Sequence, residues 1–167
     1  MLVKAARFAN LLVEALNAGV SFSHVLQAPQ KAKLDRGSYL AAQQTLYLNY
    51  GRAARFLEPA ALASSIALAA LQHKHKNEAL LMAASAGCVV AEIAVWKKGL
   101  DPINREVATW DVRGMPDNWP KYRNRWHALH AVRNALCVGA FSASLLALLQ
   151  KTNKKSLSLR AFKSRAA

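Results

Sequence analysis

Two residues with chemically useful side chains lie one helical turn apart in the second half of the chain. His130 and Arg133 occur in the stretch RNRWHALHAVRNAL, residues 123–136, at the mouth of a long uncharged run. Histidine exchanges a proton near neutral pH, and arginine is a permanent cation that donates several hydrogen bonds. We assign Arg125 and His127 in this stretch to a solvated helix end. His130 and Arg133 are predicted to face a functional site.

Four apolar segments must position these residues. The later three are apolar around their whole circumference, with small residues interspersed, and a protein of 167 residues cannot bury three such helices completely. Each uncharged stretch is shorter than the ~18 residues of a clear membrane span, but the absence of a polar face favours lipid over water. We therefore expect an all-α integral membrane protein, an up-down-up-down four-helix bundle. Its segments are 8–26, 57–71, 79–96 and 128–150.

The charge distribution predicts how the chain is organised around the membrane. Net charge is +14, and Asp117 is the last acidic residue. We expect residues 1–150 to form a four-helix transmembrane domain and residues 151–167 a basic, flexible cytoplasmic tail that attracts anionic lipids. Both termini are expected on the cytoplasmic side of a bacterial inner membrane. No nucleic-acid motif is present, so a nucleic-acid partner is not expected. Cys88 and Cys137 lie in apolar runs and are expected to be unpaired.

The ionisable residues of the four segments are predicted to share one layer. In an up-down bundle, the ends of the first and third segments lie beside the beginnings of the second and fourth. His24 and Glu92 come late in their segments, whereas Glu58, His130 and Arg133 come early in theirs. At ~1.5 Å per residue, all five lie within about two turns of the same membrane surface. Ionisable groups at such depth usually face the bundle interior, which predicts a pocket at this end.

Several motifs around these residues resemble a known family. The stretches SHVLQAPQKAKLDRGSYLAAQQTLYLNYGRAARFLEP, DPIN and MPDNWPKYRNRWHALHAVR are similar to the anthrone oxygenase-like family of small membrane proteins. The similarity covers roughly residues 16–150. The resemblance implies a four-helix membrane fold and, as in characterised members, oxidation of an anthrone to an anthraquinone by dioxygen. The residues that match the family pattern are His24, Gln43, Gln44, Tyr47, Glu58, Asn104, Trp126, His130 and Arg133.

The chemistry implied by this resemblance gives each of these residues an expected role. A histidine would remove a proton from the substrate, with neighbouring carboxylates holding its tautomer, and an arginine would stabilise the resulting anion. Amide and hydroxyl groups would bind the oxygens of a small hydrophobic aromatic substrate, on which a tryptophan would stack. The expected catalytic residues are His24, Glu58, His130 and Arg133. The expected substrate-binding residues are Gln44, Tyr47, Asn104 and Trp126.

Other functions use the same residues. His24, His130 and Glu58 form a two-histidine-one-carboxylate set of the type that binds non-haem iron, so the presence of a metal or another cofactor stays open. A non-enzymatic membrane protein is the alternative to an oxygenase. It would be a transporter or channel subunit, with polar residues through the whole membrane depth, or a structural partner in a larger complex. The sequence also leaves the oligomeric state open.

Overall fold

All regular structure in the described chain is helical. The computed structural model describes the backbone of residues 2–165 and the side chains of residues 2–150 apart from 48 and 49. The elements are α1 (Leu2–Lys31), α2 (Arg36–Thr45), α3 (Leu48–Leu71), α4 (Lys76–Val95), the π-helical segment η1 (Trp96–Leu100), α5 (Asp101–Ala108) and α6 (Trp119–Arg165). The all-α class predicted from the sequence is thereby confirmed.

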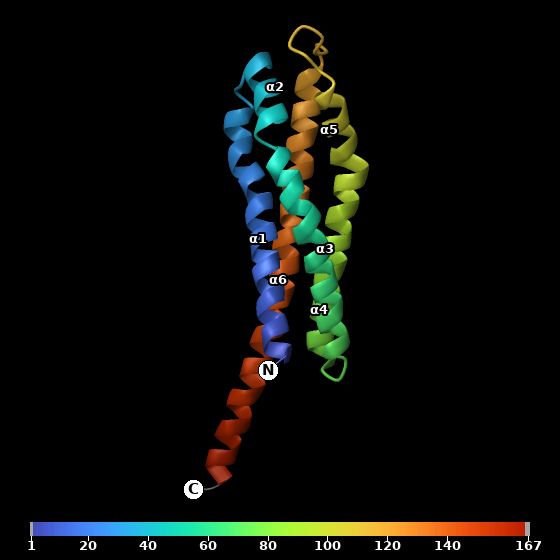
Figure 1. The fold of residues 1–167 in the computed structure, drawn as a ribbon. Coiled ribbons are helices and arrows are strands. Elements are labelled where there is room, and N and C mark those ends of the chain that lie inside the picture. Colours follow the sequence, from blue (N-terminus) through green and yellow to red (C-terminus); the bar gives the residue numbers. More distant parts are fainter. Residues whose placement is uncertain (1, 166–167) are drawn as a thin grey trace.

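The long helices α1, α3, α4 and α6 lie side by side and form the body of the molecule (Figure 1). Helix α1 packs against α3 and α6, and α4 packs against the same two helices. The N-terminus and the turn between α3 and α4 lie at one end of this body. The short helices α2 and α5 and the loop after α5 lie at the other end, and the last part of α6 extends beyond the N-terminal end (Figure 1).

Three of the described helical stretches are long and apolar enough to cross a membrane. They are Tyr50–Leu71, Lys76–Ala108 and Trp119–Gln150. Helix α1 is not among them. The structure therefore supports a helical protein with three candidate spans, and the role of α1 as a fourth span remains a proposal.

The burial pattern of α1 is the reverse of that in a soluble protein. The residues that α1 buries are all polar, whereas its large apolar side chains are exposed, such as Phe8 at 70 %. The buried residues follow each other at steps of three or four, with one step of seven, and so lie on one face of the helix. They are Arg7, Asn10, Glu14, Asn17, Ser21, His24 and Lys31.

The end of the body that carries α2 and α5 is closed by an apolar cluster. Asp35 begins α2 as its N-cap, because its carboxylate accepts hydrogen bonds from the Ser38 backbone N–H at 3.0 Å and from the Ser38 hydroxyl at 2.7 Å. Helix α2 then packs on α5. The cluster comprises Tyr39, Leu40, Leu100, Ile103, Val107, Trp110, Met115 and Trp126.

Several element boundaries differ from those expected. The first helix extends beyond 8–26 at both ends, the last begins at Trp119 rather than Ala128, and the third continues through η1 into α5. Polar residues ended the apolar runs without ending the helices. Pro102 does not interrupt the chain because it lies in the first turn of α5, where its missing N–H is not required. Gln44 lies on α2, which is a separate helix from α3, the helix that carries Glu58.

Candidate active site

Two facing histidines form the centre of the candidate site. His24 on α1 and His130 on α6 have ring centroids 4.0 Å apart, and each residue is 5 % exposed. Trp126 precedes His130 by one turn of α6, with its ring centroid 4.0 Å from that of His130 and 5.2 Å, edge-on, from that of His24. Within the described residues, Nδ1 of both histidines is buried without a hydrogen-bond partner. No protein group of this region therefore fixes the tautomer of either ring at Nδ1.

A buried ion-pair cluster lies one turn from the histidines. Arg133 donates hydrogen bonds to Glu58 on α3 and to Glu92 on α4, the latter at 2.9 Å. Asn17 on α1 donates a further hydrogen bond to Glu92 at 3.0 Å. One guanidinium thus holds two carboxylates. This cluster connects the four long helices and fixes the position of Arg133.

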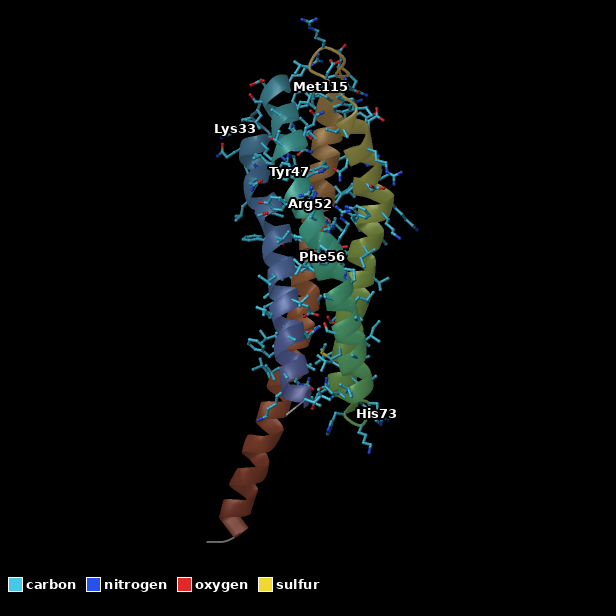
Figure 2. All side chains as sticks on the ribbon, in the orientation of Figure 1. Lys33, Tyr47, Arg52, Phe56, His73 and Met115 are labelled. Atoms are coloured by element: carbon cyan, nitrogen blue, oxygen red, sulfur yellow. The ribbon has the colours of Figure 1, made fainter. Side chains whose placement is uncertain are left out.

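A cavity of about 710 Å³ adjoins the histidine pair, in the size range of small-molecule sites. It is lined by three of the four residues expected to be catalytic, His24, His130 and Arg133, and by all four expected to bind substrate, Gln44, Tyr47, Asn104 and Trp126. Glu58 does not line it and acts on it only through Arg133. Figure 2 shows Tyr47 towards the end of the body that carries α2 and α5, between Met115 in the loop and Phe56 on α3.

The rest of the lining combines aromatic rings with polar side chains. Trp96, Trp110 and Tyr50 contribute rings, and Gln43 and Arg55 contribute hydrogen-bonding groups. The centroid of the Tyr50 ring is 4.8 Å from that of His24. A wall of this composition suits a flat, apolar ligand that carries a few oxygen atoms.

The four expected substrate-binding residues already make contacts within the protein. Asn104 accepts a hydrogen bond from Trp126 Nε1 at 3.0 Å, and the Tyr47 hydroxyl donates to Gln27 at 2.6 Å. The Gln44 amide donates to the carbonyl oxygens of Val107 and Trp110. These contacts hold the cavity wall together. They do not use the Asn104 amide NH₂ or the Gln44 carbonyl oxygen, and both residues line the cavity.

Lys31 is a buried residue at the site that the sequence reasoning missed. It is 6 % exposed, and its Nζ lies 3.8 Å from the centroid of the Tyr47 ring and 4.2 Å from that of Trp126. Nζ also donates to Gln43 at 2.7 Å. Burial lowers the pKa of Lys31 to about 7. Its position seven residues after His24, on the same face of α1, was the signal that would have identified it.

The two residues assigned to a solvated helix end differ from each other. Arg125 is exposed, as expected. His127 is only half-buried, and its ring meets that of Trp126 edge-on at a centroid distance of 5.3 Å. His127 therefore packs on the ring of Trp126, which lines the cavity, and is not simply solvated.

The two-histidine-one-carboxylate metal set is not assembled in the structure. Across the described residues, no three His, Cys, Asp or Glu side chains are grouped so that they could hold a metal ion. The carboxylate of Glu58 is engaged by Arg133, whereas the two histidines contact each other and the aromatic wall. Cys88 and Cys137 are both free, as expected.

Comparison with known proteins identifies the family. No curated protein and no solved structure matches the chain. The family model described as anthrone oxygenase matches residues 47–143, which is more than half of the 167 residues. The match includes Glu58, His130 and Arg133, whereas His24 and Gln44 precede it. This chain belongs to the anthrone oxygenase family.

Proposed function

We propose that this protein is a membrane-embedded oxygenase that oxidises a hydrophobic polycyclic phenol, of the anthrone or quinol type, with dioxygen. The observation that carries the proposal is the 710 Å³ cavity, in which two contacting imidazoles and an arginine meet a largely aromatic wall. Family membership supports the same reaction class.

The reaction of an anthrone is balanced by dioxygen alone. The methylene carbon loses two hydrogens and becomes a carbonyl carbon with one oxygen atom of dioxygen. The other oxygen atom leaves as water with the two hydrogens, so dioxygen accepts all four electrons. The protein must remove the first proton from carbon or from a phenolic hydroxyl, because the resulting electron-rich anion is the species that reacts with dioxygen.

The side chains of the cavity suit these tasks. His24 or His130 accepts the proton, and the ring of the other lies within contact distance to receive it in turn. Arg133 is a fixed cation beside the developing anion, held by Glu58 and Glu92. Trp126 and Tyr47 face the flat ring of the substrate. The Asn104 amide NH₂ donates to a substrate oxygen, and the Gln44 carbonyl oxygen accepts from a substrate hydroxyl.

The protein is proposed to reach this substrate in a bilayer, with α1 as a fourth span. The apolar side chains of α1 point outward and its polar residues point inward, as expected of a helix surrounded by lipid. An even number of spans places both termini on one side, and the basic tail assigns that side to the cytoplasm of a bacterial plasma membrane. Residues 151–167 are proposed to contact anionic lipids.

The decisive experiment measures turnover directly. The purified protein in detergent, supplied with an anthrone, should consume dioxygen and form the anthraquinone faster than buffer and faster than a heat-inactivated sample. Mass spectrometry with isotopically labelled dioxygen should find one labelled oxygen atom in the product. A rate equal to that of the buffer across several anthrones and quinols would refute the oxygenase.

One observation favours the non-enzymatic alternative. Buried polar residues continue along α1 from the cavity to the opposite end, where Arg7 pairs with Glu78 at 2.7 Å. A transporter or channel subunit requires polar groups at every depth. A structural partner of a larger complex would instead tolerate substitution of the cavity residues. Solute flux into liposomes without any dioxygen uptake would favour the transporter.

A further inference from the structure

A second buried polar cluster lies inside the bundle, next to the cavity but not part of its wall. Its centre is Glu14 on α1, which is 2 % exposed. One carboxylate oxygen, Oε1, accepts hydrogen bonds from Ser85 Oγ at 2.6 Å, Ser65 Oγ at 2.9 Å and Asn10 Nδ2 at 3.2 Å. The other oxygen, Oε2, is buried and has no hydrogen-bond partner within the described residues.

Glu14 differs from the other buried carboxylates because it lacks a cation. Glu78 is paired with Arg7, and both Glu58 and Glu92 are paired with Arg133. The described chain places no arginine, lysine or histidine within ion-pair distance of Glu14. An ionised carboxylate removed from water without a counter-charge is strongly unfavourable, so a positive partner would stabilise the ionised form of Glu14.

The groups around Glu14 are oxygen donors of the kind that hard cations prefer. The hydroxyls of Ser65 and Ser85 lie 3.1 Å apart, and Ser64 lies 2.9 Å from the Asn10 amide. The oxygen and nitrogen of an asparagine amide exchange places by a flip of the group, so Asn10 can also present an oxygen. Hydroxyl and carboxylate oxygens from α1, α3 and α4 therefore converge beside the Asn10 amide, which can add its own oxygen by such a flip.

We propose that Glu14, Asn10, Ser64, Ser65 and Ser85 bind a monovalent alkali cation. The single carboxylate sets the charge, since one positive charge balances it, whereas a divalent ion would leave an uncompensated charge in the bundle. The site is distinct from the cavity wall because none of these five residues lines the cavity, although Asn17, which does line it, lies one turn from Glu14 on α1. It depends on neither the oxygenase nor its substrate.

The first test is thermal unfolding of the full chain in detergent. Sodium, potassium and choline chloride are compared at constant ionic strength. One alkali cation should raise the melting temperature saturably, by roughly 5 °C at a hundredfold excess over its dissociation constant, whereas choline should not. E14Q should abolish this cation-specific rise, and Ser85→Ala should shift its midpoint to higher concentration. The matched control E106Q, at an exposed position on α5, should behave like the parent protein.

The second test uses the unmodified protein, in case E14Q does not fold. A hydrophobic carbodiimide should label Glu14, as identified by peptide mass spectrometry, more slowly when the stabilising cation is present. Labelling at an unchanged rate would overturn the proposal. An equal response to choline and to the alkali cations, or a cation response retained in E14Q, would also overturn it. If Glu14 is not labelled at all, the melting temperatures of the parent protein decide.

Discussion

The imidazole of His24 contacts that of His130, with ring centroids 4.0 Å apart, and so joins α1 to α6 beside the cavity. If this pair transfers the proton, H130Q and H24Q should each reduce anthrone oxidation by about a hundredfold or more while the protein stays folded. Dioxygen uptake and circular dichroism of the same samples check this. R125A, at an exposed position, is the control and should retain the parent rate. Activity equal to that of the parent in both H130Q and H24Q would remove the histidines from the mechanism.

Because Arg133 pairs with two carboxylates, replacing Arg133 should lower the free energy of unfolding more than replacing one of the carboxylates. Replacing Arg133 by methionine leaves Glu58 and Glu92 buried together without a cation, and should destabilise the protein by about 3–5 kcal/mol. E58Q leaves the pair of Arg133 and Glu92 balanced and should cost about 1–2 kcal/mol.

Recovery from the loss of Arg133 should require both carboxylates to be neutralised. The double variant R133M/E58Q still buries Glu92, so only the triple variant with E92Q is expected to regain most of the stability. Denaturant unfolding in detergent measures the series. Full recovery in the double variant would show that Glu92 needs no partner.

The lowered pKa of Lys31 predicts that the free energy of unfolding increases as the pH rises. Its folded-state pKa is about 7 and its ordinary value is about 10.5, so between these values the unfolded chain binds a proton that the folded chain does not. The cost of burying Lys31 is therefore greatest below pH 7 and is relieved as the pH rises. Comparison at pH 7 and pH 9.5 avoids Tyr47, whose pKa burial raises to about 12. The parent protein should gain more stability over this interval than K31M, and equal slopes would contradict the assignment.

Topology is tested by reporters on the two sides of the candidate span Trp119–Gln150. A reporter fused after Gln150 should be cytoplasmic, and one inserted in the loop between α5 and α6, at residues 111–114, should lie on the opposite side. This loop is suitable because it lies outside the helices. Signals from the same side would contradict the proposed orientation.

The tail should be dispensable for chemistry. Residues 151–167 are basic and follow the region matched by the family, so truncation after Gln150 should leave dioxygen uptake unchanged. The same truncation should weaken the salt-dependent attraction of the detergent-solubilised protein to vesicles containing anionic lipid. Loss of activity in a folded, truncated protein would place the tail in the catalytic machinery.

The approximate place of the site followed from the sequence because helical spacing fixes which residues share a face. The steps of four and three residues among Asn17, Ser21 and His24, and of three residues between His130 and Arg133, place each set on one helix face, and the structure buries both faces. Whether these residues act in catalysis stays a prediction.

Which residues of the site contact each other could not be predicted from helical spacing. Contact of His24 with His130, and the sharing of Arg133 between two carboxylates, depend on how each helix is rotated about its axis. Spacing along one helix does not determine that rotation. Lys31 was missed because it follows the apolar run, and because a lysine at a helix end is normally solvated.

The reversed burial of α1 has a consequence for how the protein is made. Because α1 is synthesised before α3, α4 and α6, it has none of these partners beside it when it leaves the ribosome. Alone in a bilayer it would bring Arg7, Glu14 and His24 against acyl chains, at a cost of about 2.5–3.5 kcal/mol for a charged group at the centre. As the proposed fourth span, α1 would therefore depend on α3, α4 and α6, which are synthesised after it, and its stable insertion would be coupled to assembly of the bundle.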